Sequence, residues 1–136
     1  MGLLIDSNVW IEYERGRFSI PDFLTKHGDQ TVAIAAITAS ELLTGTHRGS
    51  FPILREKRRI SVEATLQNVA IVSFDLNVAR VHAALWAEIE AVGQTSVDPH
   101  DLIIAATAVY LNYALVSYDI KDFQAVPGLR VIHPNS

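Results

Sequence analysis

Four acidic residues lie where secondary-structure elements are expected to end or begin. They are Asp6, Glu41, Asp101 and Asp119. Asp6 ends an expected strand, Glu41 and Asp119 follow one within a few residues, and Asp101 lies in the first turn of a helix expected from Pro99. The carboxyl ends of parallel strands meet at one edge of a sheet, where ligands bind. If the helix from Pro99 starts at that edge, the four carboxylates converge on one cleft.

Such a cleft would suit a divalent metal ion. Four crowded carboxylates repel one another and raise each other's pKa values unless a cation offsets their charge. Mg²⁺, for which Mn²⁺ can substitute, prefers hard oxygen ligands and keeps waters and substrate phosphates in its shell. One or two such ions can activate water and stabilise an in-line displacement at phosphorus. The set of acids therefore predicts metal-dependent phosphoester chemistry.

Each acid also has a purely structural interpretation. Glu41 could complete a capping box with Thr38, three positions earlier. Asp6 could cap a helix that begins near Asn8, and Asp101 could favour the positive end of its helix dipole. Asp98 is expected to be the N-cap before Pro99 rather than a ligand. The metal hypothesis consequently depends on the whole set.

Short apolar runs alternate with helical patterns along the chain. The expected strands are residues 2–6, 31–36, 69–72, 114–117 and 129–132. The expected helices run from Asn8 to about Gly16 and over residues 21–27, 38–47, 52–68, 75–92 and 99–111, with a helical turn at 119–124. This alternation predicts an α/β fold with a mostly parallel sheet of four to five strands. No repeat or linker divides the sequence, so residues 1–136 are expected to form one domain.

The composition limits the classes of protein that remain. Of 136 residues, 49% are hydrophobic and 19% charged, which excludes disorder as the state of the whole chain. Cysteine is absent, which excludes disulfide scaffolds and thiolate metal sites. The first apolar run is too short for a signal peptide, and residues 102–111 span about half a bilayer. We expect a soluble, cytoplasmic protein without a membrane partner.

Four motifs in order resemble a known family. They are Leu4-Ile5-Asp6-Ser7-Asn8, Thr38-Ala39-Ser40-Glu41-Leu42 with Gly45, Asp101-Leu102-Ile103-Ile104-Ala105-Ala106, and Leu115-Val116-Ser117-Tyr118-Asp119 followed by Asp122-Phe123. In this order they resemble a PIN-domain ribonuclease, and the closing Val126-Pro127-Gly128-Leu129 is similar to the end of the VapC toxins of bacterial toxin–antitoxin pairs. The resemblance covers nearly the whole chain.

The resemblance implies a PIN-like three-layer α/β/α sandwich and a Mg²⁺-dependent endoribonuclease. Asp6, Glu41 and Asp101 match the three most regular acids of the family, and Asp119 matches a fourth that varies. Asp122 is the alternative to Asp119 as this fourth acid. The supporting positions implied are Ser7 and Asn8, which match a region that orients ligands or water, together with Thr38 and Ser117. The implied partners are RNA, a small antitoxin that blocks the cleft, and a second copy of the chain.

A basic stretch offers a contact for RNA. Five of the 11 basic residues lie within 12 positions, although the net charge of the chain is -4. They are Arg48, Arg55, Lys57, Arg58 and Arg59. They could contact the RNA backbone or form only a solvated helix face. Trp10 and Trp86 could stack bases, but both lie in helical apolar patterns that favour the core or a subunit interface.

Two other functions are compatible with the sequence. The first is a non-catalytic RNA-binding or scaffolding domain with a degenerate metal site. The presence of all four acids argues against this function. The second is a metal-dependent phosphatase that acts on small molecules. Asp6-Ser7-Asn8 superficially resembles the aspartyl-nucleophile phosphatases, but Asn8 stands where those enzymes use a second acid.

Overall fold

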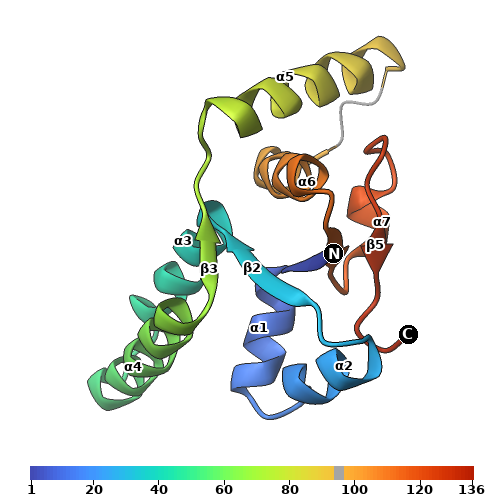
Figure 1. The fold of residues 1–136 in the computed structure, drawn as a ribbon. Coiled ribbons are helices and arrows are strands. Elements are labelled where there is room, and N and C mark those ends of the chain that lie inside the picture. The colour runs from blue at the N-terminus through green and yellow to red at the C-terminus, as the bar shows by residue number, and fades with distance from the viewer. Residues whose placement is uncertain (94–96) are drawn as a thin grey trace.

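A parallel sheet forms the centre of the molecule (Figure 1). The computed structural model describes residues 1–93 and 97–136, and within them it contains one five-stranded sheet with the order β3-β2-β1-β4-β5. Every pair of neighbouring strands is parallel. The strands are β1 (Gly2–Ile5), β2 (Thr31–Ala35), β3 (Ala70–Val72), β4 (Ala114–Val116) and β5 (Val131–Ile132). The predicted α/β fold and its parallel sheet are confirmed.

The order of the strands creates a switch point between β1 and β4. Successive strands are added on one side of β1 as far as β3, and the chain then returns to add β4 and β5 on the other side. In the register of this pair, Ile5 lies opposite Val116. The residues that directly follow, Asp6 and Ser117, therefore leave the sheet side by side at its carboxyl edge, which is where α/β sheets bind ligands.

Helices cover both faces of the sheet and complete three layers. They are α1 (Ser7–Glu14), α2 (Ile20–Lys26), α3 (Ala36–Thr46), α4 (Pro52–Asn68), α5 (Leu76–Ala91), α6 (Pro99–Leu111) and α7 (Ile120–Phe123). Residues from α1 to α4 pack on one face with Leu3, Ile5 and Ile34, whereas residues from α5 to α7 pack on the other face with Leu4 and Leu115. In Figure 1, α6 lies between the sheet and the outer helix α5.

The sequence pattern of the buried elements explains their positions. All four residues of β1 are buried, as expected for a strand covered on both faces. Helix α6 is apolar almost all round and buries Leu102 and every residue from 104 to 108. Asp75 and Asp98 cap α5 and α6 through their side chains, and the predicted cap at Asp98 is confirmed.

Several predicted boundaries are wrong by one to two residues. Helix α3 begins at Ala36, directly after β2, and not at Thr38. Val92, the last residue of the predicted helix over 75–92, is the C-cap residue that follows α5 and is 72% exposed. Strand β5 is shorter than the predicted 129–132.

Helix α4 extends from the body of the protein beside α3 (Figure 1). Val62 is its one buried residue. Phe51, Ile53 and Leu54 at its start and Ile60 in its middle are all exposed. Over residues 1–93 and 97–136, none of the helices has both the length and the hydrophobicity that crossing a bilayer requires.

Candidate active site

Asp6 is held at the end of β1 by contacts to both of its carboxylate oxygens. Oδ1 accepts a hydrogen bond from the backbone N–H of Ser7 at 2.8 Å, which caps α1. Oδ2 accepts a hydrogen bond from the hydroxyl of Ser117 at 2.8 Å. The residue is only 5% exposed. The register of β1 and β4 brings Asp6 and Ser117 together, so the sheet itself fixes the carboxylate.

Asn8 joins the ends of the same two strands. Its amide nitrogen donates to Ser117 Oγ at 3.3 Å and to Asp119 Oδ2 at 3.1 Å. Its side-chain oxygen accepts from the backbone N–H of Tyr118 at 3.4 Å, and Ser117 Oγ accepts from the N–H of Asp119 at 3.0 Å. Asp6, Asn8, Ser117 and Asp119 therefore form one connected network. The predicted supporting roles of Asn8 and Ser117 have a geometric basis here, and Ser7 contributes its backbone N–H.

Asp101 lies in the first turn of α6. The N-cap residue Asp98 uses Oδ1 to accept from the backbone N–H groups of His100 and Asp101, at 2.9 and 3.2 Å. Burial raises the pKa of Asp101 to about 7, with smaller upward contributions from the charges of Asp98, Asp6, Asp122 and Glu41. A carboxyl group with such a pKa is poised to lose its proton when a cation arrives.

Glu41 lies inside α3, one turn after Thr38. Because α3 begins at Ala36, Thr38 is already within the helix, and the predicted capping box of Thr38 and Glu41 is wrong. Thr38 is fully buried, and its Oγ1 and the Oε1 of Glu41 are buried atoms without a hydrogen-bond partner among the described residues. Burial raises the pKa of Glu41, and the charge of Asp6 raises it further. The interpretation of Glu41 as part of a capping box is thereby excluded.

The acids at this edge of the sheet act on one another electrostatically. Burial is the main reason that the pKa of Asp6 is raised, its hydrogen bonds oppose the rise, and Asp119 and Asp122 add repulsion. Asp6 in turn raises the pKa of both Glu41 and Asp101. The predicted acids therefore belong to one region of negative potential. Asp122 lies in the first turn of α7, exposed, and contributes to this field together with Asp119.

The donor groups of this region fit a hard divalent cation. They are carboxylate oxygens, they disfavour one another's ionised forms, and Glu41 Oε1 is buried without a partner. Among the described residues, however, no three acidic or histidine side chains are arranged closely enough to hold a metal ion as they stand. Convergence of the four predicted ligands on one ion stays a prediction.

The five predicted basic residues have different local surroundings. Arg48 and Arg58 line a cleft together with Glu41. Arg59 is paired with Glu56 on the exposed side of α4, with Nε donating to Oε2 at 3.0 Å. Arg55 donates to the carbonyl of Gly49 at 3.1 Å, and Lys57 is exposed. The structure thus separates two arginines close to the acids from the rest of the stretch.

Arg15 is a residue of this cleft that the sequence did not indicate. It is the C-cap residue of α1 and lines the cleft with Arg48 and Arg58. Basic residues clustered in the sequence drew attention to α4, whereas Arg15 reaches the same cleft from another helix. The one signal for Arg15 in the sequence was the length of α1. This helix begins at the Asp6 cap, so its length determines which residue stands at its end.

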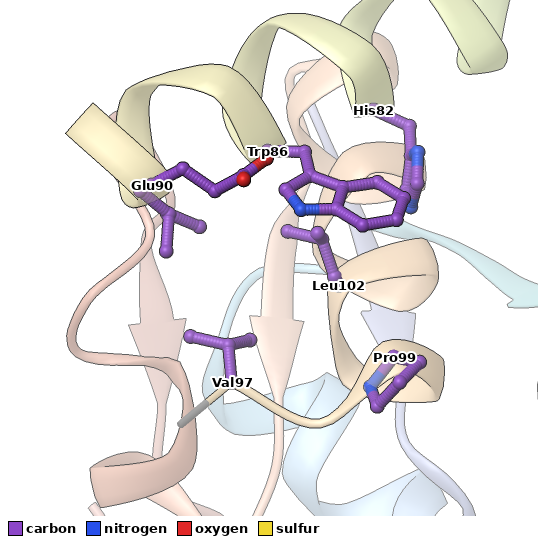
Figure 2. Close-up of a pocket in the computed structure, with 7 residues that line it drawn as sticks. His82, Trp86, Glu90, Val97, Pro99 and Leu102 are labelled. Atoms are coloured by element: carbon purple, nitrogen blue, oxygen red, sulfur yellow. The ribbon is translucent and has the colours of Figure 1, made fainter. Parts of the chain in front are cut away.

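The two tryptophans have different environments. Trp10 is buried, as predicted, and its indole N–H donates to the carbonyl of Ile5 at 3.2 Å. Trp86 is 53% exposed, so of its two predicted environments the core is excluded and a subunit interface stays a prediction. Figure 2 shows its indole beside His82 over a pocket of about 260 Å³ that lies between α5 and the start of α6. A helical apolar pattern cannot distinguish a core face from an uncovered one.

Comparison with protein families gives a match over most of the chain. The sequence model of the PIN domain matches residues 3–129. Ribonuclease VapC1 of Rickettsia felis is 31% identical over 140 residues, which cover 100% of this chain and 98% of the relative. The tRNA(fMet)-specific endonuclease VapC of Salmonella typhimurium is 25% identical over 135 residues, with 94% of each chain covered.

Solved structures with the same fold come from toxin–antitoxin complexes. VapBC from Salmonella typhimurium, crystallised with bound DNA, has a TM-score of 0.85 at 21% identity, with 98% of both chains covered. VapBC2 from Rickettsia felis, bound to a DNA fragment from its promoter, has a TM-score of 0.83 at 23% identity and the same coverage. The three-layer arrangement of this chain is therefore that of a known fold.

Proposed function

The chain belongs to the PIN-domain family and, within it, to the VapC ribonucleases; from this premise we propose that it cleaves RNA with a divalent metal ion held by Asp6, Glu41, Asp101 and Asp119. Mg²⁺ is the expected ion, and Mn²⁺ can substitute. The observation that carries the proposal is the group of mutually repelling carboxylates at the switch point of the sheet. The whole chain is proposed to act as one nuclease domain in the cytoplasm.

The residues around the acids have distinct parts in this reaction. When bound, the ion would supply a water molecule of lowered pKa and positive charge to offset the charge that develops on the phosphate. Ser117 and the Ser7 N–H fix the Asp6 carboxylate, so that this ligand needs little reorganisation. Asn8 orients Asp119 by its hydrogen bond to Oδ2. Asp101, whose pKa is raised to about 7, would hold the ion in its ionised form and would release its proton on binding it.

We further propose two protein partners. A relative of the same fold, VapBC-5 from Mycobacterium tuberculosis, is described as a member of the VapBC family of toxin–antitoxin systems, with a TM-score of 0.73 at 25% identity. By this likeness, a small antitoxin binds the present chain and blocks its cleft. A second copy of the chain is the other proposed partner.

A cleavage assay with purified protein tests the activity. A tRNA mixture, a single-stranded RNA and a generic phosphate ester are incubated with Mg²⁺, with Mn²⁺ or with EDTA, for the wild type and for Asp101→Asn. We expect internal cleavage of RNA by the wild type with either ion, none in EDTA, and none by the variant. Cleavage of the ester alone would indicate the phosphatase, and RNA binding without cleavage would indicate the non-catalytic domain. Either result would contradict the proposal.

A further inference from the structure

A cleft lined by three arginines opens directly beside the proposed metal site. Its volume is about 220 Å³, and it lies between the end of α1, the middle of α3 and the first half of α4. The residues that line it are Ile11, Glu14, Arg15, Glu41, Leu42, Gly45, Arg48 and Arg58. Glu41 belongs both to this cleft and to the group of carboxylates. Glu41 thus connects the cleft to the proposed metal site.

The charges of the cleft oppose those of the molecule as a whole. The chain carries a net charge of -4, yet this cleft holds three guanidinium groups against the carboxylates of Glu14 and Glu41. If Glu41 is engaged as a metal ligand, Glu14 is the one remaining acid to balance three cations. The cleft is therefore a local positive site within an acidic protein, which is what an anionic ligand needs for recognition.

One of the three arginines is already positioned. Arg58 donates from Nη1 to the carbonyl of Gly45 at 3.4 Å, and its Nε lies 3.8 Å from Oε1 of Glu14. The bond to Gly45 ties α4 to the last turns of α3. The pairing with Glu14 is long and partly exposed, so it contributes little stability and can be exchanged for a stronger partner.

From this arrangement we propose that Arg15, Arg48 and Arg58 form a subsite for a phosphodiester group of the RNA that neighbours the group being cleaved. The inference rests on the proposed function, because Glu41 connects the two sites. Arginine suits this ligand, since its planar guanidinium can make two parallel hydrogen bonds to phosphate oxygens. The incoming phosphate displaces Glu14 from Arg58. Lys57 and Arg59 on the same helix lie outside the subsite.

A pair of double variants tests the subsite. Arg48→Gln with Arg58→Gln removes two charges from the cleft, and Lys57→Gln with Arg59→Gln removes two charges from the same helix outside it. Binding of single-stranded RNA is measured from 50 to 300 mM salt in the uncleaving Asp101→Asn background. We expect the slope of log affinity against log salt to fall by about 0.7 for the cleft variant, the value for one phosphate contact on a single strand, and to stay unchanged for the control.

Cleavage kinetics provide a second measurement in the otherwise native chain. The contact to a neighbouring phosphate is present in both the bound substrate and the transition state, so the cleft variant should raise KM several-fold with little change in kcat. Replacing Arg48 and Arg58 by Lys should recover part of the binding, because the charge returns without the planar fork. Glu14→Gln should bind RNA more tightly than the wild type, because it removes the competitor of the phosphate at Arg58.

The outcomes separate this inference from the proposed function. Equal salt slopes for the cleft variant and the control would overturn the subsite while leaving metal-dependent cleavage intact. Loss of antitoxin binding by the cleft variant with unchanged RNA binding would also overturn it, and would assign the cleft to an acidic segment of the partner. Cleavage by the Asp101→Asn protein itself would instead refute the proposed function. Thermal melts of each variant verify that the fold is intact.

Discussion

The side chain of Asp6 illustrates how the site is prepared at the scale of single residues. Its two oxygens accept hydrogen bonds from groups that belong to β1–α1 and to the end of β4. Burial alone would favour the protonated acid, whereas these hydrogen bonds favour the carboxylate. The net effect is a raised pKa, and the two hydrogen bonds hold the Asp6 side chain in a fixed orientation.

Ser117→Ala should test the importance of that orientation. The variant removes the hydroxyl that donates to Asp6 Oδ2 and that accepts from Asn8 and from the N–H of Asp119. Loss of a residue that orients a metal ligand typically costs about 10–100-fold in metal affinity or activity, and we expect a loss of that size here. The readouts are Mg²⁺ affinity by calorimetry and RNA cleavage rate. Ser73→Ala, an exposed serine distant in sequence, is the control; equal activity of the two variants would refute the role of Ser117.

The affinity for Mg²⁺ should depend on pH through Asp101. Its pKa is raised to about 7, so below that pH the group carries a proton that must leave before it can bind a cation. We expect the affinity to rise roughly tenfold per pH unit below 7 and to level off above it, as release of one proton requires. Calorimetry at pH 5.5, 6.5 and 8 measures this. In Asp101→Asn the dependence should be much weaker; an affinity independent of pH in the wild type would contradict the assignment.

At the scale of elements, helix α3 shows where the sequence was misleading. The spacing of Thr38 and Glu41 predicts a capping box, but the chain turns helical directly after β2, two residues earlier. Ala35 then serves as an N-cap without a side-chain hydrogen bond. Thr38 and Glu41 consequently lie one turn apart inside the helix, with buried oxygen atoms that have no partner among the described residues. The capping-box rule therefore failed at Glu41, a residue of the proposed metal site.

Thr38→Val should raise the free energy of unfolding of the metal-free protein. Thr38 is fully buried with an unpartnered hydroxyl, and such a group costs about 1–3 kcal/mol that an apolar group of the same shape avoids. Thr107→Val is the matched control, because Thr107 is also buried but donates to the carbonyl of Ile103 at 2.8 Å. The control should be neutral or slightly destabilised. Urea unfolding of both decides, and destabilisation by Thr38→Val would show that the hydroxyl does find a partner.

Elements with strong local signals were predictable, and contacts between distant elements were not. The apolar run of β1 and the all-round apolar α6 identify buried elements without further information. The order of acids after strands predicted their common edge, since parallel strands must end together. The cleft of Arg15 and Arg58 could not be predicted, because it depends on how α1 and α4 pack against α3. Sequence proximity alone could not show that Arg58 lines this cleft while the neighbouring Arg59 is paired with Glu56.

For the whole molecule, the central feature is a fold that gathers acids at the switch point of its sheet. Each of Asp6, Glu41 and Asp101 has its pKa raised first by burial and then by neighbouring acids. The raised pKa of Asp101 means that its ionisation destabilises the folded state as the pH rises through about 7. Binding of a cation to these carboxylates should therefore stabilise the folded protein, because the unfolded chain does not hold the ion.

Thermal unfolding of wild type and Asp101→Asn at pH 8, each in EDTA and in millimolar Mg²⁺, tests this feature most directly. In EDTA the variant should melt at a higher temperature than the wild type, because it lacks one of the crowded charges. Mg²⁺ should raise the Tm of the wild type and change that of the variant much less. If Asp101 served only the helix dipole, the variant would lose about 0.3–1 kcal/mol with or without metal. A lower Tm of the variant in EDTA, with no response of the wild type to Mg²⁺, would contradict the account.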